Sequence, residues 1–211
     1  MLHAYVITIV GVALAQAAPG PNFLAVVSAG LGQGRRAALF TVLGVVTGML
    51  AWGTLVALGL ATVLALYPDL LTAMKIVGGA YLIYMAARAL VAMARSRPMR
   101  VAAQQRALTA FGAWWRGLLV IMTNPKAALM WTAVGTFLFG SGLEPWQVAA
   151  FAPMAAASGT VIYGGYGLLF TTNPAVRAYQ RFAGWIELAF GAAFGVLGGR
   201  LLIDGMREMR S

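Results

Sequence analysis

The sequence predicts an all-α membrane protein of six transmembrane helices, arranged as two inverted repeats of three helices each. Three observations lead to this prediction. The 211 residues are 61% hydrophobic and 9% charged, with a mean hydropathy of +0.82, so most of the chain must face lipid or other helices. The apolar residues gather into six long segments. The first segment of each half is interrupted at a proline, where a helix must break.

The first segment covers residues 2–33 and is interrupted by the tetrapeptide Pro19–Asn22, which reads PGPN. Proline lacks a backbone N–H and clashes with the preceding turn, so the helical ladder opens here. Residues 15–17 are similar to a signal-peptide cleavage site, but no Lys or Arg precedes the apolar run, and we expect no cleavage. The segment is therefore predicted to be a broken transmembrane helix.

Five further apolar segments follow, at residues 37–67, 70–94, 110–140, 146–171 and 182–203. Each is longer than the ~20 residues that a membrane-spanning helix needs. The fourth segment is interrupted by Thr123-Asn124-Pro125-Lys126, as the first is by its own prolines. The longest loop is the polar stretch at residues 95–106.

The loop charges predict the orientation in the membrane. Basic residues fall in alternate loops, whereas the loops at residues 68–69 and 141–145 carry none. Because basic loops stay in the cytoplasm, we expect both termini on the outer side. The basic loop residues are Arg35, Arg36, Arg95, Arg97, Arg100, Arg106, Arg177 and Arg181.

The two halves then cross the membrane in opposite directions. Residues 1–106 form the first three-helix repeat with its cytoplasmic loop, and residues 107–211 form the second; together they make one transmembrane domain. An in-plane pseudo-two-fold axis would relate them. After each break comes a helix with small residues four apart, which predicts close helix packing. These rows are Gly44, Gly48 and Trp52 in one half and Ala155, Gly159 and Tyr163 in the other.

The two breaks are the predicted substrate site, because secondary transporters build midplane sites from discontinuous helices. A helix beginning at Pro21 directs its positive dipole end at a carboxylate, and the Asn22 amide both donates and accepts hydrogen bonds. The alternative for Pro19–Asn22 is a packing kink. The expected substrate-binding residues are Gln16, Pro19, Gly20, Pro21 and Asn22 in the first half and Asn124, Pro125 and Lys126 in the second.

Two ionisable residues inside the predicted membrane segments are candidates for proton coupling, because buried charges in a bilayer are costly. Lys126 lies ten residues beyond Arg116, about 15 Å along a helix. It would serve substrate or coupling, or else snorkel or cap carbonyls freed by Pro125. Glu187 would be a coupling carboxylate or counter-ion to Lys126, or else pair structurally with Arg181 or with a backbone donor.

Several chemistries are not expected. The chain has no cysteine and one histidine, His3, so we predict no disulfide, no transition-metal site and no cofactor. With no nucleophile and base together, an enzyme is not expected. The net charge of +10 lies in loops between apolar runs, which favours membrane anchoring over nucleic-acid binding. We interpret Tyr163 and Tyr166 as packing or interface aromatics.

Three stretches resemble the LysE/RhtB family of amino-acid exporters. PGPNFLAVVSAGLGQGRRAALFTVLGVVTGMLAWG (residues 19–53) is similar to the first two segments of that family, GGAYLIYMAARAL (78–90) to its third, and NPKAALMWTAVGTFLF (124–139) to its fourth. Departures occur at Ala38, where the family usually has Gly, at Gly135-Thr136, where it often has Pro-Gln, and at Glu187, in a segment that is usually apolar. These departures leave the substrate open.

The resemblance implies a multi-pass protein of the bacterial inner membrane that exports amino acids or closely related small metabolites, coupled to protons. A channel-like or uncoupled carrier is the alternative to proton coupling. Alternating access would proceed around the midplane site. A metal or inorganic-cation exporter on a related scaffold, and a membrane scaffold protein without transport, are the alternatives. The glycine rows also allow a homo-oligomer.

Overall fold

A computed structural model of the chain describes residues 2–60 and 107–172 continuously, together with single residues and short runs between 66 and 91 and between 174 and 209. Across these described residues the chain is helical and has no strand, which confirms the predicted all-α class. The named elements are α1 (Leu2–Ala17), α2 (Pro21–Leu55), the π-helix η1 (Val56–Leu60), α5 (Ala110–Met122), α6 (Pro125–Gly140) and α7 (Pro145–Leu169).

The chain divides into two compact units, each drawn from both predicted repeats. Unit 1 is Met1–Ala61 with Val101–Arg177, and unit 2 is Thr62–Arg100 with Ala178–Ser211. Unit 1 contains every named helix. Unit 2 holds the predicted third and sixth segments, of which the structure describes scattered positions, and Glu187 lies outside the described residues.

Both predicted breaks are present in unit 1. α1 ends at Ala17, and α2 begins at Pro21 with Gly20 as its N-cap. In the second half, α5 ends at Met122 and α6 begins at Pro125, with a bend of 59° between the two axes. Proline fits at the first position of a helix, where the missing N–H costs nothing. Each proline therefore ends one half-helix and starts the next.

Gly34 divides α2 into a first arm (residues 21–33) and a second arm (residues 35–55). Its φ of 81° and ψ of −175° fall in a region open to glycine alone. Val26 and Val42 both lie within 4 Å of the position that a Cβ on Gly167 would occupy, although 16 residues of straight helix span about 24 Å. The two arms therefore fold back on each other, at the loop that separates the predicted first and second segments.

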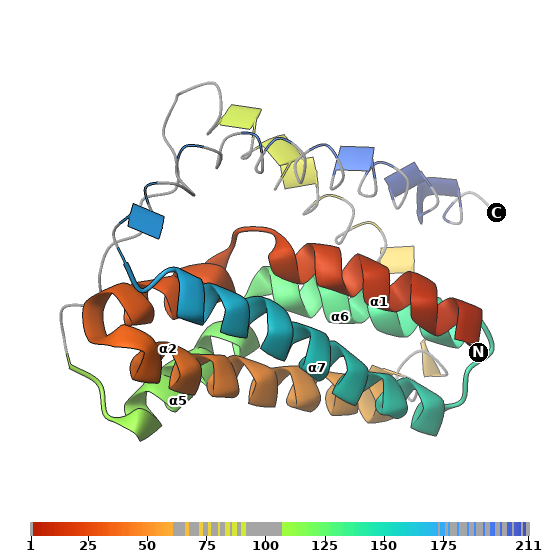
Figure 1. Ribbon diagram of the computed structural model, residues 1–211. Helices are drawn as coiled ribbons and strands as arrows, with labels where there is room; N and C mark the ends of the chain where they lie inside the picture. The colour runs from red at the N-terminus through yellow and green to blue at the C-terminus, as the bar shows by residue number, and fades with distance from the viewer. Residues whose placement is uncertain are drawn as a thin grey trace. The chain divides into compact units, whose positions relative to one another are not determined.

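The helices of unit 1 pack in two parallel pairs (Figure 1). α7 runs alongside α1, since the Tyr5 hydroxyl donates to the Gln147 carbonyl near one end and the Tyr166 hydroxyl donates to the Ala17 carbonyl, at 2.8 Å, near the other. The second arm of α2 runs alongside α5 in the same way. In both pairs, the first helix of one half (α1 or α5) therefore runs parallel to a later helix of the other half (α7 or the second arm of α2).

Glycine allows the close contact between the second arm and α5. A Cβ on Gly44 would overlap the Trp114 carbonyl oxygen, and one on Gly117 would overlap the Thr41 carbonyl oxygen. The two backbones therefore touch directly, as small residues permit in membrane helix pairs. The predicted packing role of the row through Gly44 is confirmed.

Length and composition make several of these helices suitable for a bilayer. Among the described residues, Pro21–Gly59 and Pro145–Leu169 are long and apolar enough to cross a membrane, although the Gly34 turn divides the first of them into two arms. The bent pair α5 and α6 adds a third if it is one broken span. α1 is a shorter apolar helix. The count of six spans and their inverted arrangement remain predictions.

Candidate functional site

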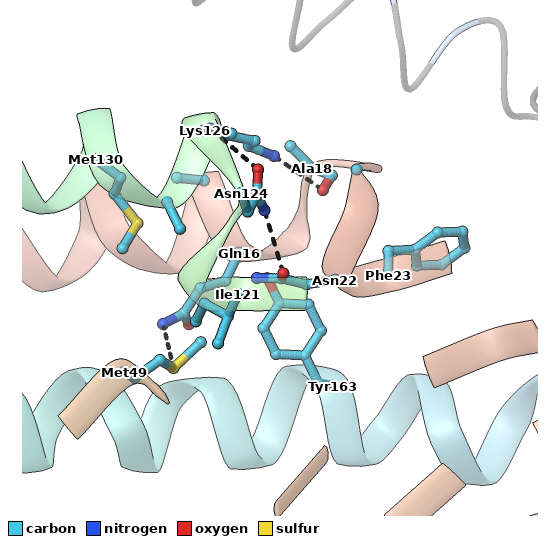
Figure 2. Close-up of a pocket in the computed structure, with 13 residues that line it drawn as sticks. Gln16, Ala18, Asn22, Phe23, Met49, Ile121, Asn124, Lys126, Met130 and Tyr163 are labelled. Carbon is cyan, nitrogen blue, oxygen red and sulfur yellow. Dashed lines mark hydrogen bonds between the residues drawn. The ribbon is translucent and has the colours of Figure 1, made fainter. Parts of the chain in front are cut away.

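The two helix breaks meet inside unit 1 through their asparagines (Figure 2). The Asn124 Nδ2 atom donates to the Asn22 Oδ1 atom at 3.1 Å. Both side chains are buried, with exposed fractions of 4% and 7%. Asn124 lies at the N-cap of α6 and Asn22 in the first turn of α2, so the position of each proline determines where each amide lies.

The asparagine pair belongs to a longer chain of hydrogen bonds. The Asn22 Nδ2 atom donates to the Tyr163 hydroxyl at 3.4 Å, and Asn124 Oδ1 accepts from the Lys126 backbone N–H at 3.0 Å. Buried amides are costly unless they are paired in this manner. The network links helices from both halves of the chain through side chains that can donate and accept.

Lys126 extends from the second break to the first. Its Nζ donates to the Ala18 carbonyl at 3.1 Å, and lies 3.5 Å from where a Cβ on Gly20 would be. The lysine side chain is half-buried. A Cβ at position 20 would be in ordinary van der Waals contact with the lysine side chain. The ammonium thus bonds a carbonyl at the opposite break, whereas one of our alternatives had it capping carbonyls freed by Pro125.

Gln16 forms the wall of the site on the α1 side. Its Nε2 donates to the Ala155 carbonyl at 3.0 Å, and its Oε1 accepts from the Ser158 hydroxyl at 2.8 Å. The exposed fraction of Gln16 is 2%. Gln16, one of the predicted site residues, thus lines the cavity and also bonds the neighbouring helix α7.

Two aromatic side chains that we predicted as packing residues have polar roles at the first break. The Tyr163 hydroxyl accepts a hydrogen bond from the Asn22 amide, and the Tyr166 hydroxyl donates one to the Ala17 carbonyl at 2.8 Å. At the second break, Trp52 Nε1 donates to the Ile121 carbonyl at 3.3 Å. Trp52 and Tyr163 end the two small-residue rows, so each half supplies an aromatic donor or acceptor to the break of the other. The matching positions of Trp52 and Tyr163, at the ends of the two rows, are the sequence feature that could have predicted these hydrogen bonds.

A cavity of about 20 Å³ lies among these side chains. A volume of this size accommodates water, whereas pockets for small organic ligands are usually ~300–1,000 Å³. In the structure the polar groups around this small cavity bond one another. The lining residues are Ala15, Gln16, Ala18, Gly20, Asn22, Phe23, Met49, Ile121, Asn124, Lys126, Ala127, Met130 and Tyr163.

Some of the predicted site residues line the cavity and others do not. Gln16, Gly20, Asn22, Asn124 and Lys126 line the cavity. The lining does not include Pro19 or Pro21, and Pro21 is exposed. The prolines therefore position the site by breaking the helices. The side chain of Pro125 lies outside the described residues, as does Glu187. Among the described residues, no three His, Cys, Asp or Glu side chains gather as a metal site would require.

Comparison with known proteins tests the family resemblance that the motifs suggest. Residues 13–205 match the profile of the LysE type translocator family. An uncharacterized membrane protein of Escherichia coli K12, YahN, is 30% identical over 98% of this chain and 92% of its own length. The threonine efflux protein of the same organism is 28% identical over 88% of this chain and 91% of its own length.

The leucine efflux protein of Salmonella choleraesuis is 32% identical over 54% of this chain and 53% of its own length. No solved structure matches the chain. Because the family profile covers most of the sequence, from the first helix to near the C-terminus, the resemblance predicted from the motifs is confirmed. The chain belongs to the LysE type translocator family.

Proposed function

We propose that this protein is a secondary-active exporter of amino acids or closely related small metabolites in the bacterial inner membrane. One observation carries the proposal: the two proline-started half-helices meet through a buried amide pair, with a lysine beside it. Convergent polar groups at two helix breaks are the usual construction of a transporter site. Relatives named as threonine and leucine efflux proteins support the substrate class.

The chemistry of the cavity suits a zwitterion. Lys126 would take the substrate carboxylate, because an ammonium that now bonds a neutral carbonyl gains more from an anion. The carbonyl of Ala18, once released by Lys126, would accept from the substrate ammonium. The amides of Asn22 and Asn124 would bond either end. Substrate entry therefore replaces bonds that the protein now makes with itself.

The reciprocal packing supports alternating access by two inverted halves. In the predicted topology, the first and fifth segments run inward while the second and fourth run outward. The parallel pairing of α1 with α7, and of the second arm with α5, agrees with those directions. The cavity would widen toward one side at a time, by rocking or gating of the halves around it.

Coupling to protons is the finer part of this proposal. Lys126 is the candidate at the site, since an ammonium that must leave water is the group whose protonation responds most to opening and closing. Glu187 is the second candidate, from the sequence alone. Proton coupling predicts that a pH gradient drives accumulation of substrate against its own gradient.

The decisive experiment is counterflow in proteoliposomes loaded with a panel of amino acids, with and without an imposed pH gradient. We expect saturable exchange, and we expect Asn22→Ala to abolish it. Thr54→Ala is the matched control, because that exposed hydroxyl bonds within its own helix, to the Leu50 carbonyl. Exchange of no amino acid by folded wild-type protein would overturn the proposal. Exchange that ignores the pH gradient would remove proton coupling alone.

A further inference from the structure

Arg116 is another cation inside a predicted membrane segment, and it is not among the residues that line the cavity. It lies in the middle of α5 and its guanidinium reaches the first arm of α2, where Nη2 donates to the Ser28 hydroxyl at 3.0 Å. Its Nη1 atom is buried and has no hydrogen-bond partner among the residues that the structure describes. A buried, unpaired N–H on a charged group is costly, so it requires an explanation.

Ser28 does not neutralise this charge. Its hydroxyl proton is donated to the Ala25 carbonyl at 3.1 Å, which leaves a neutral oxygen facing Arg116. Within residues 2–60 and 107–172, Glu144 is the only residue with an acidic side chain. Glu144 caps the start of α7, at the other end of the helix pairs from the start of α5 (Figure 1). Among the described residues, the guanidinium therefore bonds the Ser28 hydroxyl through Nη2, while its buried Nη1 keeps unused donor capacity.

The pair has a defined place relative to the central site. Ser28 follows Asn22 by six residues, and Arg116 precedes the end of α5 at Met122 by six residues. Each interval is about 9 Å of helix. Both lie on the side of the Gly34 turn, with its exposed Arg35 and Arg36, which the charge rule places in the cytoplasm. The pair thus lies between the cytoplasmic surface and the asparagine pair.

We propose that Arg116 and Ser28 form a cytoplasmic carboxylate-binding subsite, which takes the carboxylate of the amino acid before the central site receives it. The proposal rests on the proposed export function. A guanidinium presents paired N–H groups that match a carboxylate, so Nη1 and Nη2 would bind its two oxygens. The Ser28 hydroxyl would turn from Ala25 to donate to the same anion. Such a subsite acts on substrate arriving from one side.

A carboxylate-binding role for Arg116 predicts an effect on substrate that arrives from the cytoplasmic face alone, whereas a structural role predicts equal effects at both faces. Exchange is measured in everted membrane vesicles, which present the cytoplasmic face, and in right-side-out vesicles, which present the outer face. For Arg116→Gln we expect the KM at the cytoplasmic face to rise about tenfold or more, as a lost charge-assisted bond predicts. The KM at the outer face and the maximal rate should change less than about twofold. Arg116→Lys, which keeps the charge without the fork, should fall between.

Arg36→Gln is the matched control, because it removes one exposed cytoplasmic charge and leaves Arg116 intact. It should leave both KM values unchanged. Equal KM values for Arg116→Gln and wild type at both faces would overturn the subsite while the exporter stands. Equal losses at both faces, or a fall in maximal rate alone, would make Arg116 a structural tie between α5 and α2 and also overturn it. Absence of exchange by wild type would overturn the exporter and the subsite together.

Discussion

At the scale of single residues, the molecule places its polar side chains where the helices open. Asn22, Asn124 and Gln16 are buried, and each bonds an element from the other half of the chain. Their hydrogen bonds join helices that lie more than 100 residues apart in sequence. In a membrane protein such bonds contribute modestly to stability, about 0.6 kcal/mol on average. Their larger effect is to determine which surfaces face the cavity.

The asparagine pair should show energetic coupling. Asn22→Ala and Asn124→Ala each leave a buried amide without its partner, so each should lower the free energy of unfolding by about 1–3 kcal/mol. The double variant should cost less than the sum of the two, because the second change removes the group that the first left unpaired. Thermal unfolding in detergent micelles compares the stability of the wild type, the two single variants and the double variant. Strict additivity would show that the two amides do not interact.

Replacing Lys126 should reduce transport without reducing the stability of the protein. Lys126→Met keeps the length of the side chain and removes a charge that is costly to hold away from water, so the thermal stability should stay the same or rise. Exchange should fall about tenfold or more, because the substrate carboxylate loses its cation. The two quantities are measured on one preparation. A variant that loses stability in proportion to exchange would show instead that the bond to Ala18 is mainly structural.

At the scale of elements, glycine determines how closely the helices approach. The second arm of α2 and α5 touch through backbone at Gly44 and Gly117, while Gly159 allows Met49 and Gln16 to pack against α7. The four-residue spacing of these small residues predicted such faces. It did not predict the partner of each face, because many pairings of small-residue stripes satisfy the same spacing.

Gly117→Ala should therefore disrupt the pairing of α5 with the second arm. The added methyl group would overlap the Thr41 carbonyl, and overpacking of this kind costs about 1–3 kcal/mol. Gly164→Ala, also within a helix, is the control, because a Cβ there meets nothing within 4 Å. It should be neutral or slightly stabilising, since alanine favours helix over glycine. Equal effects of the two substitutions on thermal stability would contradict the backbone contact.

At the scale of the whole transporter, the proposed mechanism requires the two halves to move against each other. Ala38, just after the Gly34 turn, lies close to two glycines from different halves. A Cβ on Gly167 of α7 would lie 3.2 Å from the Ala38 Cβ, and a Cβ on Gly30 of the first arm would lie 3.4 Å from it. Both values approach the ~3.5–4.5 Å of a disulfide. The chain has no native cysteine to interfere.

Oxidising Ala38→Cys with Gly167→Cys should join the halves at the predicted cytoplasmic end and stop exchange, and a reducing agent should restore it. Ala38→Cys with Gly30→Cys joins two arms of one half, and exchange should persist after oxidation. Counterflow in proteoliposomes, with cross-linking followed by gel mobility, checks both. Full exchange by the cross-linked Gly167 variant would argue against rocking of the halves.

The sequence by itself determined the helical class, the membrane setting, the family and the positions of both breaks. These follow from local chemistry: apolar run length, the missing proline N–H, and motifs that are contiguous in the chain. It also predicted Asn22, Asn124 and Lys126 as site residues, because polar groups beside an opened helix need partners.

Only the tertiary structure decided which residues meet. The bond between Asn22 and Asn124, the reach of Lys126 to Ala18, and the turn of Tyr163 toward the first break all depend on distances between helices. Those distances depend on side chains and glycines that pack together from remote parts of the chain. A single sequence contains the spacing within each helix, whereas the pairing of helices is a property of the packed molecule.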